Sequence, residues 1–309
     1  MYRVVEFPSE GATLQGRFYY RENAPGPAPV PTPAPVVIMA HGTSATITMA
    51  IDHYAEVLHA AGLCVLLYDH RNFGLSGGEP RQQINPWIQA RGYRAALDFA
   101  ATLPGVDAGR MAIWGDSYAG GEVIVVGACD PRVKAIVVQI PALGPKPPPP
   151  DDDGALFAAL RERLLGGDVS GSPETTVGPI PVVSFDQLGT PSLLTPISAF
   201  RWFIDYGARH GTGWLNWATR VTPNTPAPFH AGLAAPHVLA PILFMIAPQD
   251  EMPGANPAVS RLAYAAAPQP KELFEIGGGH FGLLYYPSEL FDLASGVQRD
   301  FLLRHLSRG

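Results

Sequence analysis

The sequence contains few charged residues. Asp, Glu, Lys and Arg make up only 16% of its 309 residues, whereas about a quarter is usual in a soluble chain. The 21 Lys and Arg against 27 Asp and Glu give a formal net charge of −6, and the basic residues form no cluster. Because nucleic acid and anionic lipid are bound through clustered Lys and Arg, neither partner is expected.

Long apolar runs and cysteines are also scarce. No stretch of about 18 consecutive apolar residues occurs, so no membrane partner is expected. Residues 1–7 lack the basic start and the apolar core of a signal peptide, which predicts a cytoplasmic location. The two cysteines, Cys64 and Cys129, fall in apolar segments, and this favours buried reduced thiols over a disulfide framework.

What the chain does have is an alternation of short apolar strands and longer helical segments. Segments 3–7 and 12–20 predict an antiparallel pair, and a proline-rich connector follows at 25–35. Continuous apolar runs then predict buried parallel strands at 36–40, 64–68, 111–114, 135–139, 242–247 and 272–276. Helices are predicted at 48–61, 86–102, 117–129, 257–266 and 287–306. This rhythm is typical of an α/β fold with a doubly wound, mostly parallel sheet.

The alternation stops between Pro141 and Val238. A segment of this length cannot be a simple connection, so residues 141–236 are predicted to form a cap, with residues 1–140 and 237–309 as the core domain. Helical patterns at 155–165 and 197–209 predict a largely helical cap. Its aromatic content argues against a disordered linker. Four of its aromatic residues are predicted to contact substrate: Trp202, Tyr206, Trp214 and Trp217.

One serine stands where an apolar strand runs into an apolar helix. Ser117 lies in the sequence Gly-Asp-Ser-Tyr-Ala-Gly-Gly that begins at Gly115. A nucleophilic serine in such a turn needs nearly bare neighbours, and Gly115, Ala119 and Gly120 meet that need. The alternative is that Asp116 or Ser117 only caps a buried helix. A base and an acid farther along the chain would favour the nucleophile.

A carboxylate and a histidine follow Ser117 in the order Ser, Asp, His that such a turn uses. Asp250 comes just after the predicted strand 242–247, from whose end a carboxylate reaches a site above the sheet. Glu251 is its rival, and Asp250 is preferred because its shorter side chain has less freedom to lose. His280 follows a run of glycines that lets the backbone bring its imidazole beside Ser117. The three are predicted to act as nucleophile, orienting acid and base.

Two backbone N–H groups are predicted to bind the oxyanion of the reaction. One is the N–H of Tyr118, at the positive end of the helix that starts there. The other is the N–H of Thr43, in the loop after the first parallel strand. His41 in the same loop is interpreted as structural, with its ring orienting the loop.

Two further charged residues are interpreted as scaffold. Asp69 and Arg71 lie in a turn after the second parallel strand, where they are predicted to pair and to fix the loops beneath the site. Glu122, about one turn beyond Ser117, is predicted to be solvated, since acids suit the first turn of a helix. The alternative for Glu122 is a role in substrate selection.

These segments resemble the α/β-hydrolase superfamily, especially its cap-bearing bacterial members similar to dienelactone hydrolases and Xaa-Pro dipeptidyl peptidases. The resemblance covers nearly the whole chain and rests on His41-Gly42, Asp69-x-Arg71-x-x-Gly74-x-Ser76-Gly77-Gly78, Gly115-Asp116-Ser117-Tyr118-x-Gly120-Gly121, Asp250-Glu251 and Gly278-Gly279-His280-Phe281. It implies the α/β-hydrolase fold and a serine hydrolase without cofactor or metal. Because such proteins act on varied esters, thioesters, lactones and amides, it leaves the substrate open.

Three functions fit these residues. The preferred one is a hydrolase that cleaves a carboxylic ester, thioester or lactone of a small molecule through a Ser117 acyl-enzyme. The aromatic cap predicts a mostly apolar acyl or aryl group. The second is an acyltransferase that passes the acyl group to an alcohol or amine. The third is a non-catalytic binding protein, which would lack or misplace a member of the Ser, Asp and His set. A homodimer is left open.

Overall fold

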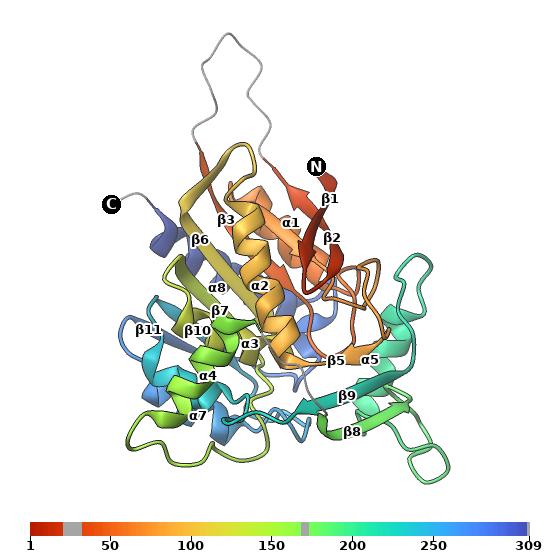
Figure 1. The fold of residues 1–309 in the computed structure, drawn as a ribbon. Helices are drawn as coiled ribbons and strands as arrows, with labels where there is room; N and C mark the ends of the chain where they lie inside the picture. The colour runs from red at the N-terminus through yellow and green to blue at the C-terminus, as the bar shows by residue number, and fades with distance from the viewer. Residues whose placement is uncertain (21–32, 168–172, 308–309) are drawn as a thin grey trace.

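The chain folds around one eight-stranded sheet (Figure 1). The computed structural model describes residues 1–20, 33–167 and 173–307. Along the sheet the strands lie in the order β1, β2, β4, β3, β6, β7, β10, β11. Their bounds are β1 (Tyr2–Ser9), β2 (Ala12–Tyr19), β3 (Ala34–Ala40), β4 (Cys64–Tyr68), β6 (Val106–Asp116), β7 (Val133–Gln139), β10 (Ile242–Ile246) and β11 (Lys271–Glu275).

The sheet is mostly parallel. β1 pairs with β2 and β2 with β4 in antiparallel orientation, and the other neighbours are parallel. β4 and β10 are buried along their whole length, which explains why their sequences are continuous apolar runs. The predicted fold class is therefore confirmed. The largest error in a strand bound is at β6, which begins at Val106 rather than 111 because its first residues are partly exposed and carry no apolar pattern.

Helices cover both faces of this sheet. The side chains of α2 (Pro86–Ala100), α3 (Ser117–Cys129) and α7 (Pro257–Ala266) join the core on one face. Those of α1 (Ile51–Ala60) and α8 (Glu289–Leu306) join the core on the other. In α3 every residue from 119 to 129 is buried, so the helix is held on all sides. That burial fixes the turn by which β6 enters α3.

The segment between β7 and β10 interrupts the alternation and contains both helices and strands. Its elements are α4 (Ala155–Gly166), β8 (Pro173–Ile180), α5 (Ile197–Gly207), β9 (Ala218–Pro223), α6 (Ala231–Ala234) and the 3-10 turn η1 (Ala235–His237). α4 and α5 match the two predicted helices. The sequence pattern does not predict β8 and β9, which form a second sheet with β5 (Gln83–Ile84) of the core. β8 is almost wholly exposed and rich in Pro, Thr and Gly, so only its pairing with β9 makes it a strand.

Both cysteines lie in the core, as predicted. Cys64 is buried in β4, and Cys129 is buried at the end of α3. The proline-rich connector predicted at 25–35 lies largely outside the described residues.

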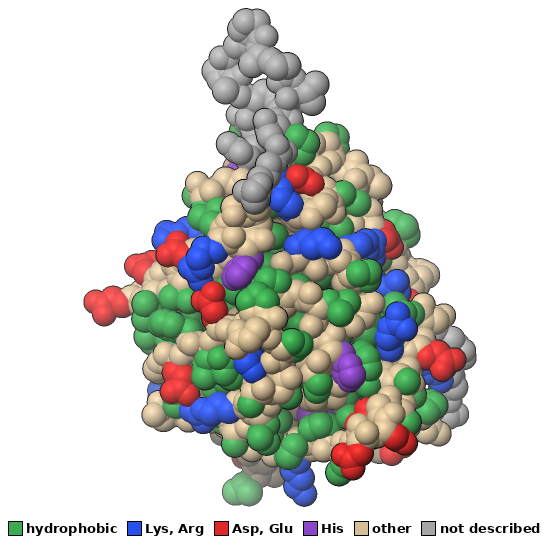
Figure 2. Space-filling model, turned by 90° about the vertical axis from the view of Figure 1, so that its left-hand side faces the viewer, with side chains coloured by type: hydrophobic (Ala, Val, Ile, Leu, Met, Phe, Trp, Pro, Cys, Tyr) green, Lys and Arg blue, Asp and Glu red, His purple; other side chains and the backbone are tan. Residues whose placement is uncertain are grey.

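The surface carries mixed charge on the face that Figure 2 shows. Lys and Arg side chains are interspersed there with Asp and Glu, and apolar side chains lie between them. Among the helices in the described part of the chain, none combines the length and apolarity needed to cross a bilayer.

A buried polar network joins α8 to the middle of the sheet. Gln298 has no exposed surface. Its Oε1 accepts a hydrogen bond of 2.8 Å from the indole Nε1 of Trp114 in β6, and its amide nitrogen donates to Gln139 of β7. Because the indole N–H is buried in an apolar core, it depends on this one acceptor.

Replacing Gln298 is therefore expected to destabilise the protein. The Gln298→Met variant keeps the side-chain volume but leaves the N–H of Trp114 without an acceptor, which costs about 1–3 kcal/mol. The free energy of unfolding in urea measures this loss. Arg299→Gln, an exposed change on the next residue, should alter it by less than about 0.5 kcal/mol. Equal stability of the two variants would show that the network contributes nothing.

Candidate active site

The turn from β6 into α3 holds Ser117 in left-handed backbone. Its φ is 51°, a conformation that a residue with a side chain rarely adopts. The turn closes tightly around it: a Cβ on Gly115 would lie 2.4 Å from the carbonyl oxygen of Ala119, and one on Gly120 would lie 3.0 Å from Cβ of Pro141. The small residues around the serine are thus required by close approach of the backbone. This geometry presents the hydroxyl of Ser117 at the carboxyl end of the sheet.

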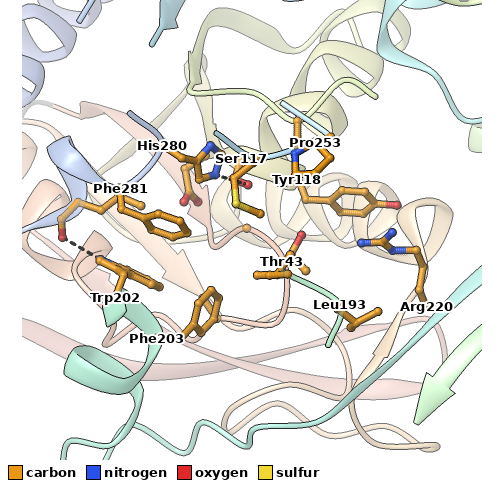
Figure 3. Close-up of a pocket in the computed structure, with 18 of the residues that line it drawn as sticks. Thr43, Ser117, Tyr118, Leu193, Trp202, Phe203, Arg220, Pro253, His280 and Phe281 are labelled. Atoms are coloured by element: carbon orange, nitrogen blue, oxygen red, sulfur yellow. Dashed lines mark hydrogen bonds between the residues drawn. The ribbon is translucent and has the colours of Figure 1, made fainter. Parts of the chain in front are cut away.

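The structure brings together Ser117, Asp250 and His280, the three residues predicted from their order in the sequence. Nε2 of His280 lies 2.9 Å from Oγ of Ser117, and Nδ1 of His280 lies 2.7 Å from Oδ2 of Asp250. The side chains of His280 and Asp250 are each only 3% exposed. Figure 3 shows the imidazole directed at Ser117. Because Asp250 accepts the Nδ1–H, the imidazole is held in the tautomer whose Nε2 is unprotonated. This nitrogen can take a proton from the serine.

Glu251, the alternative to Asp250 as orienting acid, contacts the backbone of His280 and not its ring. Its Oε2 accepts a hydrogen bond of 2.8 Å from the backbone N–H of His280, and its Oε1 accepts one from the hydroxyl of Ser198 in α5. Burial opposes the charge of Glu251, but these hydrogen bonds outweigh it and lower the pKa of the carboxyl below its usual value. Gly279 is needed beside it, since a Cβ there would lie 2.5 Å from Oε2 of Glu251. Glu251 therefore holds the loop, and Asp250 holds the ring.

The two residues whose backbone N–H groups are predicted to bind the oxyanion lie at the wall of a cavity beside Ser117. Thr43 and Tyr118 both line it. Helix α3 begins without a side-chain hydrogen bond from its N-cap, so the first N–H groups of the helix remain available. Gly42 brings the Thr43 loop close, because a Cβ on Gly42 would lie 2.8 Å from Cβ of Ser117.

A buried polar cluster lies behind this loop and corrects the prediction for Glu122. Glu122 is 1% exposed rather than solvated, because α3 is covered on all sides, and its Oε2 lies 3.5 Å from Nε2 of His70. His70 in turn donates its backbone N–H to Nε2 of His41 at 3.3 Å. Burial raises the pKa of Glu122 well above its usual value, and it lowers the pKa of His41 to about 4, so the His41 ring is neutral near pH 7. His41 also contacts the carbonyl of Gly42, as expected of a residue that orients the loop.

The predicted pair between Asp69 and Arg71 is wrong. Asp69 instead accepts backbone N–H groups of Ile47 at 3.0 Å and Leu75 at 3.1 Å. Arg71 donates to the carbonyls of Glu10 and Glu79. Asp69 still fixes loops beneath the site, but it does so through the backbone, which a reading of side-chain charges cannot detect.

Asp116 is a second buried carboxyl next to the nucleophile. It is 5% exposed, and burial raises its pKa to about 7. The nearby His280 and a backbone hydrogen bond from Gly42 favour the charged form but only partly offset the effect of burial. The sequence suggested only a helix cap at this position, and α3 shows no such hydrogen bond from Asp116.

A cavity of about 310 Å³ opens above Ser117 and His280. Its lining residues come from the loops at the carboxyl ends of the strands and from the segment between β7 and β10. They include Thr43, Ser117, Tyr118, Leu193, Leu194, Trp202, Phe203, Arg220, Met252, Pro253, His280, Phe281 and Leu284. Arg220 is a member that the sequence did not single out.

Only one of the four aromatic residues predicted to contact substrate lines this cavity. Trp202 does, whereas the other three do not. Tyr206 accepts a hydrogen bond of 2.7 Å from the backbone N–H of Tyr286, so it braces the loop after His280. Trp214 packs against Gly207 and Phe203. Trp217 is 37% exposed. Two of these four aromatic residues of segment 141–236, Tyr206 and Trp214, therefore pack against other parts of the protein and do not line the cavity.

The chain is similar to known proteins both in sequence and in fold. No protein-family model matches the chain. The quorum-quenching protein AidA of Acinetobacter baumannii is 27% identical over 277 residues, which cover 87% of this chain and 86% of AidA. The thiohydrolase aneE of Aspergillus aculeatus is 30% identical over 232 residues, which cover 72% of this chain but only 65% of the thiohydrolase.

Solved structures share the fold along the whole chain. The α/β hydrolase GrgF from a Penicillium species superposes with a TM-score of 0.70 at 22% identity, covering 99% of each chain. A dienelactone hydrolase from Anabaena variabilis superposes with a TM-score of 0.58 at 16% identity, again over 99% of each chain. These similarities show that the chain has the fold of the α/β hydrolases.

Proposed function

We propose that the chain is a serine hydrolase that cleaves an ester or thioester with a mostly apolar acyl group. The observation that carries this proposal is the hydrogen-bonded series from Asp250 through His280 to Ser117 at a cavity wall. The hydrolase and thiohydrolase names of relatives add support for this reaction type. A binding protein has no need for a strained serine aligned with a histidine.

The proposed reaction proceeds through an acyl-enzyme. Nε2 of His280 takes the proton of Ser117 while Oγ attacks the acyl carbonyl, and Asp250 keeps the imidazole oriented and stabilises its positive charge. The N–H groups of Thr43 and Tyr118 stabilise the oxyanion. His280 then gives the proton to the leaving alcohol or thiol. A water activated by His280 releases the acyl group and regenerates Ser117.

The segment 141–236 acts as the cap in this proposal. Leu193, Trp202 and Phe203 of this segment line the cavity, together with Phe281 and Leu284 of the core. These side chains form an apolar wall that favours an apolar acyl or aryl group. α4 belongs to the same segment but packs into the core beside α2 and α3, so only the part around α5 and β9 bears on substrate.

Acyl transfer shares every step up to the acyl-enzyme and differs only in the acceptor. Incubating the enzyme with a thioester and an added alcohol or amine, and quantifying free acid against transferred product, separates the two reactions.

Loss of the Ser117 hydroxyl is expected to abolish covalent labelling. The Ser117→Ala variant should not react with a fluorophosphonate probe, and its kcat/KM for 4-nitrophenyl esters and acyl thioesters should fall by at least about 10⁴-fold. The exposed Ser307→Ala variant should behave as the unmodified protein. Labelling of Ser117→Ala would mean that another residue is the nucleophile, and absence of labelling in the unmodified protein would favour the binding protein.

Neutralising the two neighbouring carboxylates is expected to have unequal effects. Asp250→Asn loses the acceptor that fixes the tautomer of His280, and its kcat/KM should fall by about 10³- to 10⁴-fold. Glu251→Gln keeps an oxygen for the backbone N–H of His280, so its kcat/KM should fall by about tenfold or less. The reverse order of the two effects would assign the orienting role to Glu251.

The raised pKa of Asp116 is expected to make stability depend on pH. Its pKa is about 7 in the folded protein against 3.8 ordinarily, so the folded state binds the extra proton between these values. This stabilisation is complete below about pH 4 and is lost as the pH rises through 7, by up to about 1.4 kcal/mol per pH unit. Asp116→Asn lacks it.

Urea unfolding at several pH values tests the prediction for Asp116. The unfolding free energy of the unmodified protein minus that of Asp116→Asn should decrease from pH 4 to 7 and then level off. Asp69, whose pKa burial raises to about 6, is present in both proteins and cancels in the difference. A difference that does not change with pH would contradict the raised pKa.

A further inference from the structure

Arg220 places a positive charge on the cavity wall that the proposed reaction does not use. Among the described residues that line the cavity, it is the one Lys or Arg. Most of the remaining side chains are apolar. A charged group in such surroundings is costly to desolvate unless it is paired, so its presence calls for a partner.

The guanidinium of Arg220 has no such partner within the described part of the chain. No carboxylate there lies within 4.0 Å of it, whereas Arg91, Arg132 and Arg304 each pair with Asp or Glu. Its Nε is buried and donates no hydrogen bond. A buried donor left unsatisfied destabilises the protein, and a ligand oxygen would remove that penalty.

The backbone that carries Arg220 is tied on both sides. β9 is the middle strand of its sheet, where Arg220 pairs with Ile84 of β5 and with Val177 of β8. Because β5 belongs to the core, this pairing links the strand to the scaffold of the active site. The side chain therefore starts from a fixed position, as a specific binding group requires.

Arg220 lies across Ser117 from the aromatic wall. Figure 3 shows its guanidinium beside the ring of Tyr118, while Trp202, Phe203 and Phe281 lie on the other side of the serine. The cavity thus has an apolar end and a cationic end, with the nucleophile between them.

We infer that Arg220 determines specificity by binding an anionic group of the substrate, a carboxylate or a phosphate. This inference rests on the proposed function. The planar guanidinium donates two parallel hydrogen bonds to such an oxyanion, with a directionality that an ammonium lacks. The substrate class is an ester or thioester with an apolar group on one side of the scissile bond and an anion on the other.

Two matched pairs of esters test this inference and locate the anion. In the first pair the acyl group differs: the 4-nitrophenyl half-ester of adipic acid against 4-nitrophenyl hexanoate. In the second the leaving group differs: 4-carboxyphenyl hexanoate against 4-methylphenyl hexanoate. The readout is the ratio of kcat/KM for the anionic ester to kcat/KM for its neutral match, measured in each variant.

Arg220→Gln should lower this ratio by about 10- to 100-fold in at least one pair, since a charge-assisted hydrogen bond is lost. The pair that responds shows which side of the scissile bond carries the anion. Arg220→Lys keeps the charge but loses the planar fork of donors, so its ratio should lie between those of the unmodified protein and Arg220→Gln. Arg261→Gln, an exposed arginine paired with Glu275, should leave both ratios unchanged.

Unchanged ratios in both pairs for Arg220→Gln would overturn the inference. If the unmodified protein hydrolyses none of the esters, the proposed function fails. The role of Arg220 is then tested by measuring ligand binding. Calorimetric titration of Ser117→Ala with each of the two anionic esters should give, for at least one of them, a Kd at least about tenfold lower than titration of the Ser117→Ala, Arg220→Gln double variant. Equal Kd values of the two variants for both anionic esters would overturn the inference independently of catalysis.

Discussion

The left-handed backbone of Ser117 is the constraint on which the rest of the site depends. A residue with a side chain held at a φ of 51° stores strain of about 1–3 kcal/mol, which persists only where the surroundings leave no alternative. The surroundings here are the buried end of β6, the buried helix α3, and the backbone N–H of Ala142, which donates to the carbonyl of Ser117 at 2.8 Å. Gly42 and Gly115 leave the space. Relaxing the turn would require moving β6 or α3, and each lies in the core.

The position of His280 depends on a second set of contacts that converge on its loop. The adjacent carboxylates Asp250 and Glu251 hold the ring and the backbone of the same residue, so one turn after β10 sets both its orientation and its height. From the other side α5 braces the loop, because Trp202 donates its indole N–H to the carbonyl of Leu284 at 3.2 Å. Trp202 therefore both lines the cavity and supports the loop that follows His280. This contact links the segment between β7 and β10 to the position of His280.

The sheet and the grouping of Ser117, Asp250 and His280 could be predicted from the sequence for one physical reason. Buried parallel strands read as continuous apolar runs, and the residues just after them, such as Ser117 and Asp250, must lie at one edge of the sheet. β8 shows the limit, since an exposed strand of Pro, Thr and Gly has no periodicity until β9 pairs with it. Glu122 shows another. Its place near the start of a helix favoured a solvated acid, and only the packing of α3 on all sides buries it.

The sequence could not single out Arg220, because its role depends on the residues that surround it in the fold. The same surroundings bear on the fate of the acyl-enzyme in the proposed mechanism. If the leaving group carries the anion, its departure leaves Arg220 without a partner, whereas Trp202, Phe203 and Phe281 lie on the side of the acyl group. In the proposed mechanism water then reaches the acyl carbonyl from the side of Tyr118 and Arg220. An alcohol or amine acceptor has to enter by that side and displace this water. In the arrangement that we infer, an acceptor with its own anion would bind Arg220 in the place of the leaving group, which would favour transfer over hydrolysis.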